Sequence, residues 1–336
     1  MTVVFATLNL YLPEVYSGVG TTMHDMAVAL AARGLPVAVA AGTLGEARTD
    51  EALGYPLHRE RSAAAIMERV AALKPRALVW NANDFLPSTP RLAELAPRSL
   101  VYLHNAEFRT RGGLAMAHER VRYVANSTFT ARQFTTCFGL PAEVLHPLVL
   151  PARCRAGAPG PTVLFVNPQV EKGVEIAMRL AEARPAVPFR VQQGWNNEAG
   201  VITHYRERAA AAGNVDWRPG GSDMSAVFDG VRLLLVPSVW EESWGRIVSE
   251  AQVNGIPVLA ARRGGLPEAV GPGGMLVDAQ APLDEWLRAL DVLCGDDAAH
   301  AALSAAALTH AARPEIDPER TVERLLDLLE AGPPGE

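Results

Sequence analysis

The chain has 336 residues, of which 49% are hydrophobic and 20% charged, and its formal net charge is −6. This length and apolar content suffice for two packed domains of about 150 residues each. The acidic balance argues against nucleic acid as a partner, and no apolar stretch reaches the roughly 18 residues of a membrane-spanning helix.

Cysteine and lysine usage narrows the class of protein further. The three cysteines, Cys137, Cys154 and Cys294, are scattered without metal-ligand spacing, and the N-terminus lacks the basic head of a signal peptide. We therefore expect a cytoplasmic protein without a metal site. Lys74 and Lys172 are the two lysines among 31 lysine and arginine residues, which suggests a GC-rich bacterial genome.

The first half alternates short apolar strands with amphipathic helices. Strands are predicted at residues 3–8, 37–41, 77–80, 100–103 and 123–125, and helices at 21–33, 63–73 and 128–136. This alternation predicts a parallel sheet covered by helices on both faces. In such sheets ligands bind at the carboxyl ends of the strands, so the loops that follow the strands are the places to search.

The second half repeats this architecture after a segment rich in Pro, Gly and Ala at residues 151–161, which reads as a linker. Strands are predicted at 162–166, 189–192, 215–217, 233–236, 258–260 and 275–277, and helices at 175–183, 202–212 and 318–330. The sequence therefore predicts an α/β protein of two Rossmann-like domains.

The stretch LLLVPSVWEESWGRIVSEAQVNGIP, from Leu233 to Pro257, carries the strongest functional signal. A buried strand runs into a polar loop and then a helix, with Glu242 and Glu250 separated by seven residues. Unpaired amides at the helix start suit an anion, and Gly245 lets a ligand approach the backbone. A carboxylate beside an anion site repels the anion, so it is better suited to bind neutral hydroxyls. A phosphate flanked by two carboxylates that bind hydroxyls describes a nucleotide sugar. Alternatively, the acidic residues are solvated charges near a helix start.

The segment PSVWEESWGRIVSEAQVNGIPVLAARRGGLPEAVGPGGMLVD resembles the donor-binding segment of retaining glycosyltransferases of the GT-B fold, family 4. The resemblance is most specific over residues 162–278. It implies an acceptor-binding domain at 1–150 and a donor-binding domain at 162–312, facing a central cleft. In GT-B proteins the last helix, here within 313–336, often returns to the first domain.

The resemblance also implies roles for individual residues of the donor site. Lys172 and Gly173 match a Lys-Gly pair whose lysine binds the donor diphosphate in the family. Family members typically have a second diphosphate-binding residue, an arginine, at the position that Asn167 occupies here. A lysine at a helix N-terminus opposes the helix dipole, which disfavours a purely solvated role for Lys172. Glu242 is expected to hold the transferred sugar and Glu250 the ribose. The remaining donor-site residues implied by the resemblance are Gly245, Arg246, Ile247, Trp217, Arg218 and Gly265.

Three loops of the first half carry weaker candidates. Gly18 and Gly20 lie in a glycine loop that enters a helix and that the resemblance places near acceptor or donor phosphate; a plain turn explains them equally well. Residues 81–84, Asn-Ala-Asn-Asp, suit hydroxyls or form a turn. His104 ends a strand, where the family has a histidine near the transferred sugar; a structural histidine is the alternative.

Arg109 and Arg111 follow in the same loop and would meet an anionic group on the acceptor, or be solvated. Ser127 needs no function beyond capping a helix.

The resulting hypothesis is a retaining, metal-independent hexosyltransferase that uses a nucleoside diphosphate sugar, UDP first, by front-face displacement. No second carboxylate pair and no D-x-D segment after a strand is present. The expected acceptor is a hydroxyl of a bacterial natural product, such as an orthosomycin of the avilamycin type, or of a cell-surface glycan. Alternatives are a GT-B epimerase or phosphorylase, a non-catalytic binding partner with the same fold and, more distantly, a dinucleotide-dependent oxidoreductase. The oligomeric state is not predicted.

Overall fold

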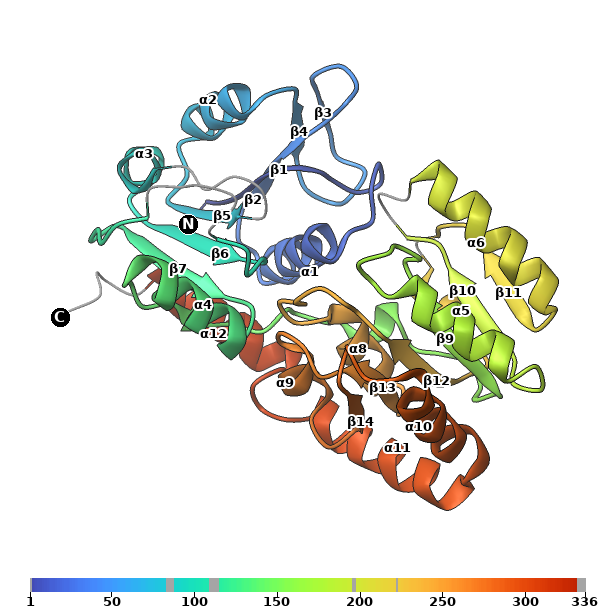
Figure 1. The fold of residues 1–336 in the computed structure, drawn as a ribbon. Coiled ribbons are helices and arrows are strands. Elements are labelled where there is room, and N and C mark those ends of the chain that lie inside the picture. Colours follow the sequence, from blue (N-terminus) through green and yellow to red (C-terminus); the bar gives the residue numbers. More distant parts are fainter. Residues whose placement is uncertain (1, 83–87, 109–114, 195–197, 222, 331–336) are drawn as a thin grey trace. The chain divides into compact units, whose positions relative to one another are not determined.

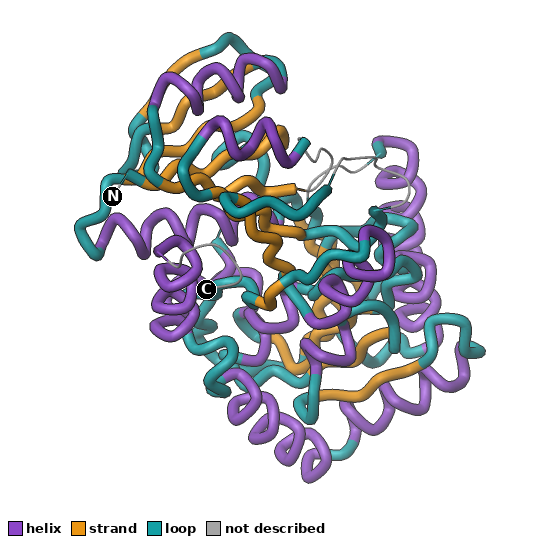
Figure 2. The backbone as a smooth tube through the Cα atoms, turned by 90° about the vertical axis from the view of Figure 1, so that its left-hand side faces the viewer, coloured by secondary structure: helices purple, strands orange, loops and turns teal. Residues whose placement is uncertain are grey.

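The computed structural model describes residues 2–82, 88–108, 115–194, 198–221 and 223–330 (Figure 1). The chain forms two compact units, each with its own sheet. The first unit contains Met1–Leu148 and Pro314–Glu336, and the second contains Val149–Arg313. Strands and helices alternate along the backbone of both units (Figure 2). No described helix is both long enough and apolar enough to cross a lipid bilayer.

The first unit is built on an eight-stranded sheet in the order β3-β4-β2-β1-β5-β6-β7-β8. All neighbours are parallel except β3 and β4, which are antiparallel. The strands are β1 Val3–Leu10, β2 Val37–Gly42, β3 Arg48–Asp50, β4 Leu57–Glu60, β5 Ala77–Ala82, β6 Ser99–Leu103, β7 Val121–Ala125 and β8 Glu143–Val144. The helices are α1 Gly18–Ala32, α2 Ala63–Leu73, α3 Thr89–Leu95, α4 Thr128–Phe138 and α12 Pro318–Glu330.

Helix α12 joins the first unit although it is separated from it in sequence by the whole second unit. Its apolar positions Val322, Leu325 and Leu329 are buried, as their helical spacing requires. The Arg98 guanidinium donates to the carbonyl of Leu329, and polar contacts join Arg33 to Glu319 and Arg324 to Glu143. The C-terminal segment is therefore fixed by a buried apolar stripe with ion pairs at its rim.

The second unit has a six-stranded sheet, entirely parallel, in the order β11-β10-β9-β12-β13-β14. The strands are β9 Thr162–Val166, β10 Phe189–Gln192, β11 Val215–Arg218, β12 Val231–Val236, β13 Val258–Ala261 and β14 Gly274–Val277. The helices are η1 Pro151–Arg153, α5 Val174–Ala183, α6 Ala199–Ala212, α7 Met224–Phe228, α8 Arg246–Gln252, α9 Leu266–Val270, α10 Leu283–Gly295 and α11 Asp297–Ala311. Two parallel-sheet α/β units confirm the predicted fold class.

The order of strands changes direction between β9 and β12. The chain runs outward from β9 through β10 to β11, and then returns to place β12 on the other side of β9. Both central strands are apolar and buried, with Val163, Leu164 and Phe165 on β9 and Leu233 to Leu235 on β12. Loops that leave such a switch point diverge and open a crevice for a ligand at the carboxyl edge of the sheet.

Two local predictions in the first unit were wrong. Gly18 and Gly20 are not in a loop, because Ser17 caps α1 by accepting a hydrogen bond from the Gly20 amide at 3.1 Å. A Cβ at Gly20 would lie 3.2 Å from the Leu12 side chain, so this glycine serves close packing. Asn81 lies within β5 rather than in the loop after it.

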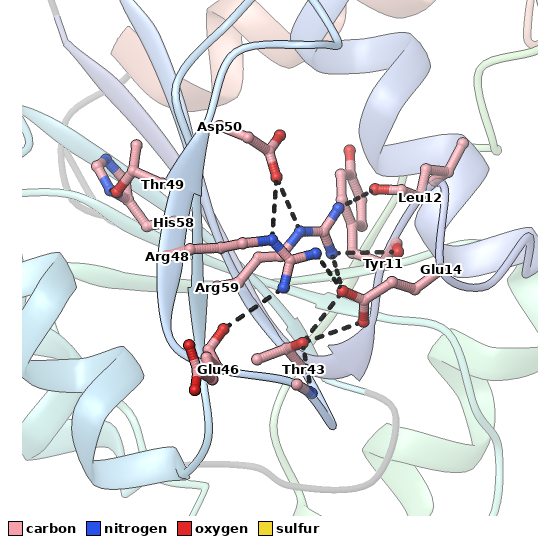
Figure 3. Close-up of polar contacts among 11 residues, drawn as sticks. Tyr11, Leu12, Glu14, Thr43, Glu46, Arg48, Thr49, Asp50, His58 and Arg59 are labelled. Carbon is pink, nitrogen blue, oxygen red and sulfur yellow. Dashed lines mark hydrogen bonds and ion pairs between the residues drawn. The ribbon is translucent and has the colours of Figure 1, made fainter.

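Strand β4 escaped the sequence analysis because three of its four residues are polar, yet all four are buried. Its Arg59 is the centre of a charged cluster that ties the sheet to the segment after β1 (Figure 3). The guanidinium donates to Asp50 at 3.0 Å and to the carbonyl of Leu12 at 2.6 Å, and lies 3.4 Å from Glu14. Long-range partners such as these are invisible to a search for hydrophobic runs.

His58, the neighbour of Arg59 on β4, makes the stability of the protein depend on pH. Its Nδ1 lies 2.8 Å from the Thr49 hydroxyl. Burial lowers the pKa of His58 below its ordinary value of 6.5, and the nearby charge of Arg69 lowers it further. A lowered pKa means that folding favours the neutral imidazole. This contribution is therefore fully present above pH 6.5 and is lost as the pH falls toward the folded-state pKa.

We expect the free energy of unfolding to decrease below about pH 6.5 more steeply in the unaltered protein than in a His58→Asn variant. The difference in slope should approach, at most, about 1.4 kcal/mol per pH unit, the value for one proton. Urea unfolding of both proteins between about pH 5 and pH 7.5 measures it, and equal slopes would contradict the assignment.

Candidate functional site

The loops that follow β9 and β12 meet at the switch point of the second unit. The first loop covers residues 167–173 and the second covers 237–245. The carbonyl oxygen of Glu171 accepts hydrogen bonds from the amides of Val239 and Trp240, at 2.9 and 3.3 Å. These bonds join the two loops by their backbones, so the side chains that they carry have a defined mutual position.

Lys172 and Glu242 form an ion pair across these loops. Lys172 Nζ lies 2.6 Å from Glu242 Oε1, and the buried Ser238 hydroxyl donates to the same oxygen at 2.8 Å. The ammonium also lies 4.8 Å from the centre of the Trp240 ring. The side chains of Lys172 and Glu242 are only 18% and 11% exposed, so solvent screens their interaction weakly.

Arg246 and Glu250 form a second pair, one turn apart on α8. Arg246 Nε lies 2.7 Å from Glu250 Oε1, and both side chains are about nine-tenths buried. Gly245 precedes the helix with φ of 89°, a left-handed conformation that favours glycine. Ile247 follows at the second position of the helix. The structure thus brings each of the two predicted carboxylates, Glu242 and Glu250, against a cation.

The glycines of this region have a structural reason for being glycine. A Cβ on Gly173 would lie 2.0 Å from the carbonyl oxygen of Pro237, and one on Gly264 would lie 2.3 Å from that of Glu242. The Gly265 amide donates to the same Glu242 carbonyl at 2.6 Å. The 237–245 loop is therefore packed between two neighbouring backbones. Contact of Gly265 with a donor stays a prediction.

The other residues predicted for the donor site lie along the same edge of the sheet. Asn167 follows β9 with φ of 65°, is 7% exposed, and its Oδ1 has no hydrogen-bond partner among the described residues. Trp217 and Arg218 lie on the edge strand β11, two strands away from β9. Arg218 Nε pairs with Asp216 at 2.7 Å, while the buried Trp217 indole nitrogen makes no hydrogen bond within the described structure.

In the first unit the structure brings His104 and Asn81 together at the carboxyl ends of β6 and β5. His104 Nε2 lies 2.9 Å from Asn81 Oδ1, and the imidazole packs against the Tyr102 ring with centroids 4.1 Å apart. The buried amide contact orients the ring, which is compatible with the structural and the functional interpretation. Asn83, Asp84, Arg109 and Arg111 were also predicted in these loops and lie outside the described residues.

Sequence reasoning missed Ser238 and Trp240 as partners of the Lys172–Glu242 pair. Ser238 is the second residue after the buried strand β12, which was the available signal, but its partner is four residues away on a folded loop. Within the described parts of the chain, no group of three or more His, Cys, Asp or Glu side chains is placed to hold a metal ion. Metal independence stays a prediction.

Comparison with known proteins relates this site to a family. Residues 164–296 match the family model described as glycosyl transferases group 1. D-inositol 3-phosphate glycosyltransferase from Corynebacterium diphtheriae is 36% identical over 155 residues, covering 42% of this chain and 36% of that relative. The enzyme of the same name from Nocardiopsis dassonvillei is 30% identical over 257 residues, covering 67% of this chain and 59% of that relative. The chain thus spans between about a third and three fifths of these relatives.

Two solved structures match over nearly the full length. Anabaena Alr3699/HepE in complex with UDP and glucose has a TM-score of 0.79 at 16% identity, covering 98% of this chain and 99% of that one. WaaG, a glycosyltransferase involved in lipopolysaccharide biosynthesis, has a TM-score of 0.74 at 15% identity, covering 98% and 100%. In sequence, residues 164–296 match the glycosyl transferases of group 1, and in fold the chain is a two-domain GT-B protein.

Proposed function

We propose that this protein is a retaining glycosyltransferase that moves a sugar from a nucleoside diphosphate sugar, with UDP as the first choice, to an acceptor hydroxyl. The observation that carries the proposal is the Lys172–Glu242 pair at the switch point of the second sheet, inside the segment that matches glycosyl transferases group 1. A ligand site at this edge needs a cation for phosphate and acceptor groups for hydroxyls, and the two loops supply both.

Each residue has a defined task in this proposal. Lys172, with the amides near Gly245, stabilises the negative charge that develops on the leaving diphosphate. Glu242 accepts hydrogen bonds from hydroxyls of the transferred sugar, since Lys172 and Ser238 both contact only its Oε1. Glu250 holds the ribose hydroxyls, while Arg246, one turn earlier in α8, holds the carboxylate in place.

The reaction breaks the bond between the anomeric carbon and the diphosphate oxygen and forms one to the acceptor oxygen on the same face. The departing phosphate oxygen takes the acceptor proton, so atoms and charge balance without a protein nucleophile. His104 is assigned a contact with the transferred sugar in this proposal. We place the enzyme in the cytoplasm, and the acceptor is a bacterial natural product or glycan. The relatives' names make an inositol phosphate the second acceptor to test.

The first test is calorimetric titration of the protein with UDP, GDP, ADP and dTDP, with and without EDTA. Tight binding of one nucleotide that EDTA does not change supports the donor site and names the base. Release of that nucleotide from its sugar donor, measured with and without acceptors, then separates an active transferase from a silent GT-B binding partner. Failure of all four nucleotides to bind would contradict the proposal.

The role of Glu250 makes a specific prediction for the bound nucleotide. Glu250→Ala should weaken nucleoside diphosphate binding by about 2 kcal/mol, because hydroxyl contacts to a charged acceptor are lost. Glu241→Ala removes an exposed carboxylate from the neighbouring loop and should leave the affinity nearly unchanged. Calorimetry on both variants measures the difference, and equal affinities would exclude Glu250 from the nucleotide site.

A further inference from the structure

A third loop at this edge of the second sheet carries an arginine that the mechanism above does not use. Arg263 follows the carboxyl end of β13, the strand next to β12. Its neighbour Gly264 is packed against the backbone of Glu242, because a Cβ at Gly264 would lie 2.3 Å from the Glu242 carbonyl oxygen. The backbone of Arg263 is therefore held beside the loop that carries the proposed sugar-binding carboxylate.

The Arg263 side chain has a buried hydrogen-bond donor that no described residue satisfies. It is half-buried, its Nε is buried without a hydrogen-bond partner, and it forms no ion pair with any of the described residues. A guanidinium carries N–H donors and no acceptor, so this buried donor can be matched only by an acceptor oxygen. Leaving it unmatched costs free energy, so a rearrangement of the side chain that brings the guanidinium against an anion is favoured.

The charges of the neighbouring cations are already compensated. Lys172 contacts Glu242 at 2.6 Å and Arg246 contacts Glu250 at 2.7 Å, so each pair has no net charge. Arg262, the neighbour in sequence, is exposed and reaches the Leu276 carbonyl at 3.5 Å. A diphosphate between two neutral pairs would meet no net positive charge from them. Arg263 is half-buried beside these loops and forms no ion pair with a described residue, so it can provide this positive charge.

We propose that Arg263 binds the diphosphate of the nucleotide donor and supplies the net positive charge of the site. This inference rests on the proposed function. The planar fork of the guanidinium offers two parallel donors, which match phosphate oxygens better than the single hydroxyl groups of a sugar. Its ligand is therefore the phosphate part of the donor and not the nucleoside.

The experiment compares Arg263→Gln with Arg262→Gln, which removes the same charge from an exposed neighbouring position. Calorimetry measures the binding of UDP, GDP, ADP and dTDP, of their nucleosides, and of inorganic pyrophosphate. For the nucleoside diphosphate that binds, Arg263→Gln should lower the affinity about 10- to 100-fold, the range for a charged hydrogen bond. The affinity for the nucleoside should stay the same, and Arg262→Gln should resemble the unaltered protein.

Salt dependence provides a second readout that a folding defect would not reproduce. The nucleotide affinity of the unaltered protein should fall more steeply with ionic strength than that of Arg263→Gln, because one charged contact is missing in the variant. Weaker pyrophosphate binding in the same variant would show that the phosphates alone are recognised, whereas loss confined to nucleotides would show that they must be attached to a base.

Three results would overturn the inference. Equal nucleotide affinity in Arg263→Gln and the unaltered protein would leave the donor site intact and remove only Arg263 from it. Equal losses in both arginine variants would assign the effect to the overall charge of the surface. If the unaltered protein binds none of the nucleotides, the proposed function falls together with the role of Arg263.

Discussion

Lys172→Ala is expected to lower turnover by roughly 10²- to 10³-fold, the usual cost of removing one preorganised donor to a developing negative charge. Nucleotide affinity should fall less, because the charge on the leaving diphosphate grows as its bond to the sugar breaks. Turnover is measured as nucleotide release from the donor sugar, and affinity by calorimetry on the same preparation. Unchanged turnover and affinity would remove Lys172 from the reaction.

The ion pair with Glu242 makes a second variant necessary for this test. Removing Lys172 leaves a largely buried carboxylate whose remaining partner among the described residues is the Ser238 hydroxyl, so a displaced loop would add to the loss of turnover. The double variant Lys172→Ala/Glu242→Gln removes both charges and should recover thermal stability without recovering turnover. Lys74→Asn changes the other, exposed lysine at a left-handed position that asparagine tolerates, and should leave both quantities unchanged.

The largest effect on stability is expected in the first unit, for Arg59→Met. The Arg59 side chain is 1% exposed, and its loss leaves Asp50, Glu14 and the Leu12 carbonyl without their central donor. Breaking a buried ion pair by removing one partner typically costs about 3–5 kcal/mol of unfolding free energy. Urea unfolding followed by circular dichroism measures this loss.

Arg48 offers a matched comparison from the same cluster. It contacts Glu14 at 2.7 Å, but its side chain is 45% exposed, so Arg48→Met should cost only about 0–1 kcal/mol. A loss of similar size in the two variants would show that burial does not set the value of the Arg59 contacts. Because each of the two units has its own sheet, urea unfolding is expected to show more than one step in both variants.

The fold class was predictable because parallel strands are buried on both faces and appear as short apolar runs. The runs around Val163 and Leu234 show this directly, and α12 was predicted with its observed bounds from the spacing of its leucines and Val322. Strand β4 was missed because Arg59 and its neighbours are buried by pairing with residues far away in sequence. A pattern of apolar residues identifies strands that are buried because they are hydrophobic. It does not identify a strand whose charged side chains are buried because they are paired with opposite charges.

The candidate site was predictable residue by residue but not as an arrangement. Sequence alone indicated Lys172 and Glu242, which stand in loops after buried strands, and Glu250, about one turn into the following helix, and the family resemblance assigned a role to each. It placed Gly18 and Gly20 in a loop, whereas the Ser17 cap draws both into α1. Helix boundaries depend on such single hydrogen bonds, which compositional signals resolve poorly.

By itself, the sequence determined two parallel-sheet domains and the loops on which chemistry is to be expected, since the apolar period of each element and the alternation of strands and helices along the chain are local properties. Only the tertiary structure decided that Lys172 is bound to Glu242, and that the Arg263 side chain is left without a partner among the described residues. The physical reason is that the sheet order brings β9, β12 and β13 side by side. Lys172 and Glu242 stand on loops 70 residues apart in the sequence, so their charges compensate one another only after β9 and β12 have paired.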